Sequence, residues 1–88
     1  MQQVNNIEQE APTIRDLIRG LGGRTNVIPT ARKLLAEQGH SYTDSAIYTT
    51  VNRNGANNAT IAAALLDAIE AEKSTRAGLE NRRKALAA

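Results

Sequence analysis

The sequence contains no phenylalanine, no tryptophan and only two tyrosines. Its hydrophobic core must therefore be built from leucine, isoleucine, valine and alanine, which bury less apolar surface per residue than large aromatic side chains do. The 88 residues are enough for one domain, and such a core leaves a monomer of this size marginally stable. Association with a second copy would bury more apolar surface, so we expect a homodimer.

Cysteine is also absent, which excludes disulfides and cysteine-ligated metals and fits a reducing compartment such as the cytoplasm. The only histidine, His40, has no cluster of acids or further histidines around it that would form a metal site or a catalytic triad. No apolar run reaches the roughly 18 residues of a membrane span. We therefore expect a cytoplasmic protein that is not an enzyme, binds no metal or cofactor, takes no small-molecule substrate and does not enter a membrane.

The formal net charge of +2 is unevenly distributed along the chain. Residues 1–12 are polar, with two acidic residues and no basic one, and we expect them to form a flexible tail. Residues 13–58 hold six basic residues against three acidic ones. This mild excess of positive charge is compatible with a nucleic-acid partner, although many solvated surfaces share it.

Four segments carry apolar residues at helical spacing, and no segment alternates as a β-strand does. They run from about residue 14 to 21, from 27 to 38, from 44 or 45 to 52 or 53, and from 59 or 60 to 86. The expected N-caps are Thr13 in a capping box with Asp16, Asn26, and Thr43 or Asp44. The sequence therefore predicts an all-α fold, a small bundle of four helices with a long last helix.

The middle of the chain has the order helix, glycine-containing turn, helix and Asn-Gly exit. The residues that carry this pattern are Ala31, Leu35, Gly39, Ile47, Val51, Asn54 and Gly55. On these residues, the sequence from about 14 to 70 resembles the phage-repressor-like helix-turn-helix family of bacterial DNA-binding proteins. The stretch from Gly39 to Ile47 is longer than is usual in that family. The resemblance implies a sequence-specific DNA-binding protein, a transcriptional regulator whose partner is double-stranded DNA.

The third helix is the element that would read DNA. If Ile47 and Val51 face the core, the 100° step per residue places polar residues on the opposite side. These residues are Ser45, Thr49 and Asn52, with Tyr48 and Arg53 at the flanks. Asparagine reads adenine bidentately, arginine reads guanine or holds phosphate, and hydroxyl groups reach phosphates. The only carboxylate on this side is that of Asp44, at the start of the helix.

The candidate DNA-binding residues are Arg32, Thr43, Ser45, Tyr48, Thr49, Asn52 and Arg53. We assign base reading to Asn52 and Thr49, and phosphate binding to Arg53 and Arg32. Arg24 and Lys33, near the start of the second helix, are weaker candidates for phosphate binding. The alternative is that these side chains form the polar surface of an ordinary helical bundle.

The last helix, about 30 residues at 1.5 Å each, would be roughly 45 Å long, which is more than a domain this small needs. Leucine recurs every seven residues at Leu65, Leu79 and Leu86, and the missing position holds Glu72, which can pair with Arg76. This register indicates either a coiled coil or the inner face of a helix that lies on its own core.

The chain is thus divided into a tail (1–12), a helix-turn-helix DNA-binding domain (13–70) and a charged extension of the last helix (71–88), which can serve as a dimerisation element. A second function remains open. In that alternative, the protein is an interaction or structural module whose long helix mediates assembly, and it does not bind DNA.

Overall fold

The computed structural model describes residues 11–22 and 25–87. Within them the chain forms four helices and no strand, so the predicted all-α fold is confirmed. The helices are α2 (Ile14–Gly20), α3 (Val27–Glu37), α4 (Asp44–Asn52) and α5 (Ala59–Ala87), and their bounds agree closely with those predicted. The predictions for residues 1–10, Gly23, Arg24 and Ala88 lie outside the described residues.

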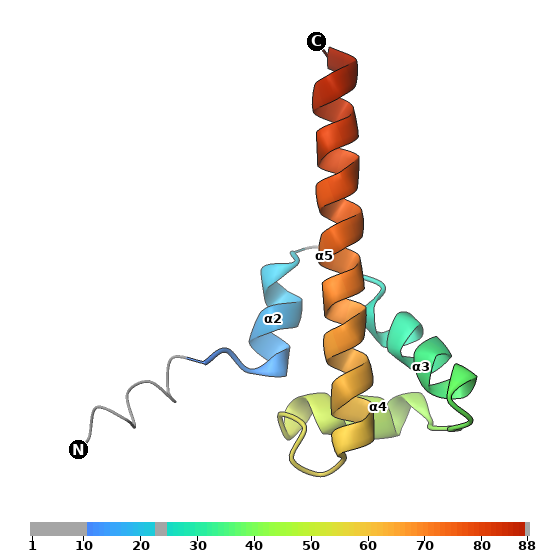
Figure 1. Ribbon diagram of the computed structural model, residues 1–88. Helices are drawn as coiled ribbons and strands as arrows, with labels where there is room; N and C mark the ends of the chain where they lie inside the picture. The colour runs from blue at the N-terminus through green and yellow to red at the C-terminus, as the bar shows by residue number, and fades with distance from the viewer. Residues whose placement is uncertain (1–10, 23–24, 88) are drawn as a thin grey trace, which may run out of the picture.

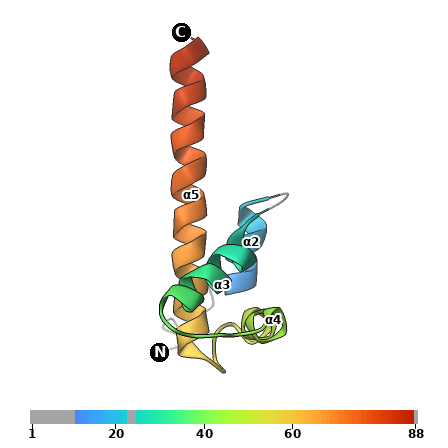
Figure 2. The same ribbon diagram turned by 90° about the vertical axis from the view of Figure 1, so that its right-hand side faces the viewer.

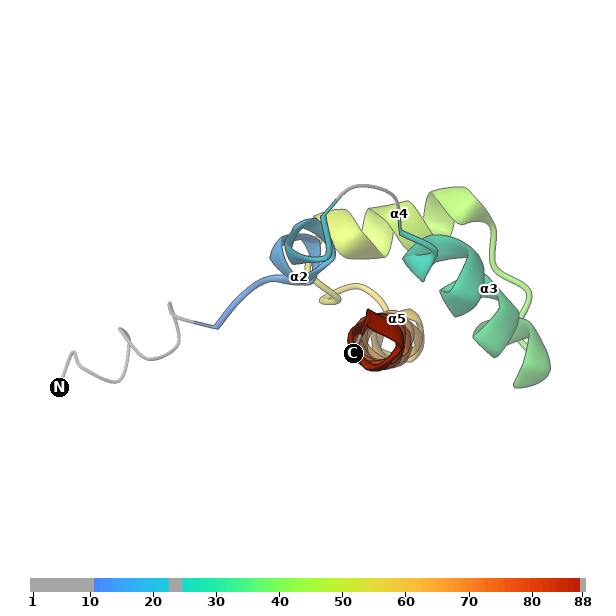
Figure 3. The ribbon, with the colours of Figure 1, turned by 90° about the horizontal axis from the view of Figure 1, so that it is seen from above.

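α5 is a single straight helix, and the other three helices gather around its N-terminal half (Figure 1). α4 crosses α5 near the start of α5 in Figure 1, and in the view turned by 90° it is seen end-on, to one side of α5 (Figure 2). Seen along α5, α2 lies toward the C-terminal end of α4, and α3 lies toward its N-terminal end (Figure 3). The second half of α5 extends beyond the other helices, and we call its exposed residues 77–87 the stem.

The core consists of aliphatic side chains and alanines from all four helices. Its buried members are Ile14, Leu21, Val27, Ala31, Leu35, Ile47, Val51, Ile61, Ala64, Leu65, Ala68 and Ile69. α3 and α5 form the most extensive helix–helix contact. α3 contributes Val27, Ala31 and Leu35, which recur at every fourth position and are completely buried.

Most of the predicted N-caps are confirmed. Thr13 and Asp16 form the capping box of α2, in which the Asp16 N–H donates to Thr13 Oγ1 at 3.0 Å. Thr43 caps α4. Asn26 stands at the N-cap position of α3, but its side chain makes no capping hydrogen bond. The backbone N–H of Asn26 instead donates to Glu72 Oε1 of α5 at 3.2 Å.

An ion pair on α5 contacts both ends of the connection between α2 and α3. The predicted pair of Glu72 and Arg76 is present, with Arg76 Nε donating to Glu72 Oε2 at 3.0 Å. The Arg76 guanidinium also donates to the carbonyl oxygen of Leu21, at the end of α2. Together with the bond from the Asn26 N–H to Glu72, this clamp holds both ends of the connection against α5.

The end of α4 and the start of α2 share a tight junction. Asn54 has φ +54°, and the Gly55 N–H donates to the Thr50 carbonyl oxygen at 2.9 Å, which closes α4 in a Schellman motif. The side chain of Asn54 accepts the N–H of Ile14 at 2.9 Å. One asparagine therefore ends α4 and satisfies a backbone donor at the beginning of α2.

The heptad leucines of α5 have different surroundings. Leu65 is completely buried, whereas 52% of Leu79 and 85% of Leu86 is exposed. The inner-face interpretation is therefore correct for Leu65, but no described residue covers Leu86. A coiled coil through the stem stays a prediction.

We expect Gly55→Ala to lower the free energy of unfolding by roughly 1–3 kcal/mol. Gly55 has φ +83°, and a Cβ atom there would lie 2.9 Å from the Cβ of Ala62. The matched control is Gly78→Ala, in the open interior of α5, which should raise stability by about 1 kcal/mol. Urea unfolding followed by circular dichroism measures both. Equal stability of the Gly55→Ala variant and the wild type would contradict the junction described above.

Candidate nucleic-acid interface

α4 turns its apolar side to the core and its polar side to solvent, as predicted. Ile47 and Thr50 are completely buried, and Val51 is nearly so. The burial of Thr50 was not predicted. Its hydroxyl donates to the carbonyl oxygen of Ala46 at 3.0 Å, so the buried hydroxyl keeps a partner. The exposed side of α4 consists of two rows of residues spaced by four, which we call the outer row and the groove row.

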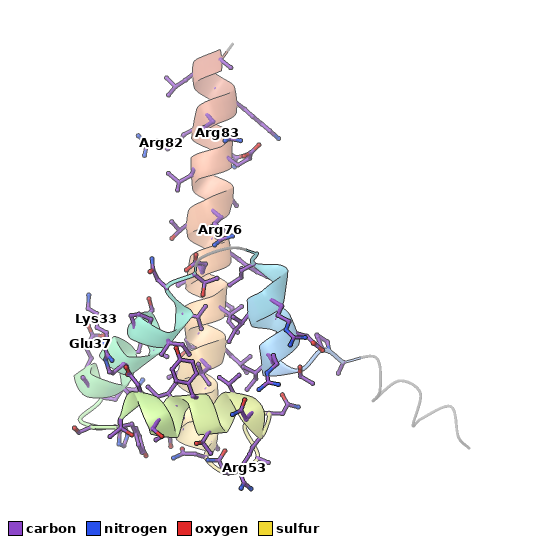
Figure 4. All side chains as sticks on the ribbon, turned by 180° about the vertical axis from the view of Figure 1, so that it is seen from behind. Lys33, Glu37, Arg53, Arg76, Arg82 and Arg83 are labelled. Atoms are coloured by element: carbon purple, nitrogen blue, oxygen red, sulfur yellow. The ribbon has the colours of Figure 1, made fainter. Side chains whose placement is uncertain are left out.

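The outer row consists of Ser45, Thr49 and Arg53, all of which are exposed. The Thr49 hydroxyl donates to the carbonyl oxygen of Ser45 at 2.9 Å and still has lone pairs with which to accept. Arg53 points away from the other helices at the end of α4 (Figure 4). Its guanidinium pairs with no residue in the described part of the chain. The outer row therefore offers its polar groups to a ligand.

The groove row consists of Asp44, Tyr48 and Asn52, and its two ends are bound to neighbouring helices. Arg32 of α3 forms an ion pair with Asp44. The guanidinium of Arg15 on α2 donates to Asn52 Oδ1. Tyr48 lies between these contacts and is 54% exposed. The single carboxylate on the exposed side of α4 is therefore neutralised, and the asparagine predicted to read bases is held from α2.

A groove of about 490 Å³ runs between α2, the start of α3, and α4. Ile18, Ile28 and Val51 give it apolar walls, whereas Arg15 and Arg19 bring positive charge. No carboxylate of the described chain lines it. The two arginines were not among the predicted site residues. Their spacing in the sequence places them on one face of α2, but it does not indicate which helix that face adjoins.

A second hollow, of about 580 Å³, lies between α3 and the turn that follows it. Arg32, Lys33 and His40 are among the residues that line it. Lys33 extends outward from α3 (Figure 4), and its ammonium group pairs with no residue that the structure describes. The positively charged residues of α3 that were predicted as phosphate contacts thus lie on the exposed side of that helix.

The long turn between α3 and α4 is anchored at its start and in its middle. α3 ends in a Schellman motif in which Gly39 has φ +89° and the His40 N–H donates to the Leu35 carbonyl oxygen at 2.8 Å. Tyr42 is half-buried and packs against the core. Its ring centroid lies 5.8 Å from that of His40. These contacts determine where α4 begins relative to α3.

Thr43 is the candidate residue whose hydroxyl caps a helix. Its Oγ1 accepts the N–H of Ala46 at 3.1 Å and so caps α4. The hydroxyl proton remains available to donate to a phosphate. The predicted contact of Thr43 with DNA therefore stays a prediction.

The described residues give no indication of metal binding or of a membrane span. Across 11–22 and 25–87, no three histidine, aspartate or glutamate side chains gather in a way that could hold a metal ion. No helix in the same ranges is long and apolar enough to cross a membrane. No protein-family model, curated protein or solved structure matches the chain. Function must therefore be inferred from the geometry of α4 and its neighbours.

We expect Thr43→Ala to lower the free energy of unfolding by about 1 kcal/mol, because the first turn of α4 loses its cap. Thr43→Ser keeps the accepting oxygen and should remain within a few tenths of a kcal/mol of the wild type. Chemical unfolding of the three proteins compares these values directly. If Thr43→Ala unfolds at the same denaturant concentration as Thr43→Ser, the cap does not stabilise α4.

Proposed function

We propose that this protein binds double-stranded DNA with sequence specificity through α4 and regulates transcription. The observation that carries the proposal is the exposed side of α4, which has five polar side chains with hydrogen-bonding groups and one carboxylate, Asp44, paired with Arg32. A helix with its side chains is about 10–12 Å across and fits a major groove about 12 Å wide. The absence of an unpaired carboxylate on this side favours contact with a polyanion.

Each candidate residue has a role in this proposal. Asn52 and Thr49 read base edges, and Arg53 holds a phosphate. The side chains of Arg32 and Asp44 are 50% and 52% exposed, and an ion pair so exposed contributes about 0–1 kcal/mol. Only one nitrogen of the Arg32 guanidinium contacts Asp44, so its remaining N–H donors can hold a phosphate while the ion pair is kept. The residues that supply hydroxyl donors to phosphates are Thr43, Ser45 and Tyr48.

The proposal includes membership of the phage-repressor-like helix-turn-helix family of bacterial DNA-binding proteins. The support is the order of α3, an anchored turn, α4 and the Asn54-Gly55 exit. A regulator of this kind works in the cytoplasm, and a sequence without cysteine suits that compartment.

We further propose that the working form is a homodimer joined through the stem. The stem extends from α5 at the end opposite α4, and it exposes Leu79 and Leu86 on one side. Stems paired in parallel would place both copies of α4 at the same end of the dimer. Two recognition helices in successive major grooves need to be about 34 Å apart.

The exposed stem also supports a second candidate function, in which the protein is an assembly module and α4 does no more than complete the fold. The two candidates differ in whether α4 binds DNA.

The first prediction from this proposal concerns the salt dependence of DNA binding. The salt slope is the fall in the logarithm of the binding constant per unit increase in the logarithm of salt concentration, and each phosphate contact contributes about 0.9 to it. With roughly three to five phosphate contacts per subunit, affinity should fall steeply between 50 and 200 mM salt. Arg53→Ala should lower the slope by about 0.9 and weaken all duplexes alike. Lys73→Ala, an exposed site on α5, is the control for a lost positive charge. No detectable binding of the wild type to any duplex from a genomic pool at about 50 mM salt would leave the assembly module as the remaining candidate.

The second prediction concerns the stem. Leu79→Ala with Leu86→Ala should convert the dimer to a monomer in sedimentation, because alanine preserves the helix and removes the apolar contacts. The control is Leu66→Ala, a leucine of α5 that is 41% exposed beside the core and should leave the dimer intact. A wild-type chain that sediments as a monomer at high micromolar concentration would exclude the homodimer.

A further inference from the structure

The groove between α2 and α4 carries positive charge that comes from α2 and not from either row of α4. Arg15 and Arg19 are one helical turn apart on α2, and both are exposed. Across the groove, α4 presents Tyr48 and Asn52. Two cations, a phenol and an amide thus border a hollow with apolar walls.

The positive charge in this groove has no counter-ion within the described chain. The guanidinium of Arg19 forms no hydrogen bond or ion pair with a described residue, and that of Arg15 donates to the neutral amide of Asn52. Residues three or four apart on a helix lie about 5–6 Å from each other, close enough for one anion to bind both. The electrostatic field of the groove therefore favours an anionic occupant.

The position of the groove identifies that occupant. The groove row adjoins the outer row on the surface of α4, so the groove runs beside the face that is proposed to meet the bases. A helix that fills a major groove has a phosphate backbone passing along each flank. A phosphodiester on the α2 flank would reach both arginines, and the Tyr48 hydroxyl can donate to it as well.

Arg15 has a second effect, on Asn52. Its guanidinium donates to Asn52 Oδ1, which keeps a second lone pair, so the oxygen and the amide nitrogen can both still meet a base. A guanidinium has five N–H donors in a rigid fork, so it can hold Asn52 and a phosphate together. The contact with the DNA backbone and the orientation of the Asn52 amide would then both depend on the side chain of Arg15.

We propose that the α2–α4 groove binds a phosphodiester of duplex DNA through Arg15 and Arg19, and that Arg15 is a positioning residue that orients Asn52 toward the base beside it. The inference rests on the proposed function, since it assumes that α4 meets DNA. It adds a contact between α2 and the DNA backbone, and it links this contact to base reading by Asn52 through Arg15.

The test measures DNA-binding affinity at several salt concentrations. It uses a duplex selected by the wild type and a scrambled duplex of equal length. Arg19→Ala should weaken both duplexes alike and lower the salt slope by about 0.9, whereas Lys73→Ala should not. Arg15→Lys keeps the charge but not the planar fork. It should therefore preserve the slope and reduce the preference for the selected duplex by about fivefold or more, the effect of one lost base contact. Adding Arg15→Lys to Asn52→Ala should cause no further loss of preference, because both changes remove the same contact.

Each result bears on one of the two claims. If the wild type binds DNA but Arg19→Ala has the same salt slope as Lys73→Ala, the groove does not hold a phosphate. If Arg15→Lys keeps the full preference while Asn52→Ala loses it, Arg15 does not position Asn52. Neither of these results contradicts the proposed function. A wild type that selects no duplex from the genomic pool contradicts the proposed function, and this inference with it.

Discussion

The contact between α3 and α5 is the constraint on which the other helices depend. In a core without large aromatic rings, stability comes from close approach of aliphatic surfaces, and α3, with its buried stripe of Val27, Ala31 and Leu35, makes the most extensive contact with α5. α4 follows α3 after an anchored turn, and Ile47 inserts into the same core. The orientation of the proposed DNA-binding surface is therefore set by packing on the opposite side of α4.

Two polar junctions complete this arrangement by fixing α2, which has few buried side chains of its own. Asn54 accepts the first N–H of α2, and the Arg76 guanidinium donates to the carbonyl oxygen of Leu21 just after it. Both contacts satisfy backbone groups that a helix end leaves open. α2 is thus held at its two ends, and this places Arg15 and Arg19 beside α4.

The fold was predictable because its signals are local. Caps such as Thr13 and Thr43 mark helix starts, and the stripe that includes Ile47 and Val51 indicates the buried side of α4. The capping hydrogen bond expected of Asn26 was wrong, because Asn26 has φ −108° and ψ 22° rather than the extended backbone from which an N-cap side chain reaches the first turn. The α2–α4 groove could not be foreseen, because it brings together residues 37 positions apart, and helical periodicity carries no information about such pairs.

Arg53 and Asn52 differ in how far the structure orders their side chains before a ligand binds. Arg53 is unpaired within the described chain, so on binding it loses side-chain entropy but no protein contact. Asn52 is already oriented by Arg15, so less of its rotamer entropy remains to be lost when it meets a base. Long-range attraction to phosphates does not require a fixed geometry, whereas base reading does. In the proposed function, the ordered Asn52 would therefore serve base reading, which depends on geometry, and the unpaired Arg53 would serve attraction to phosphates, which depends on charge.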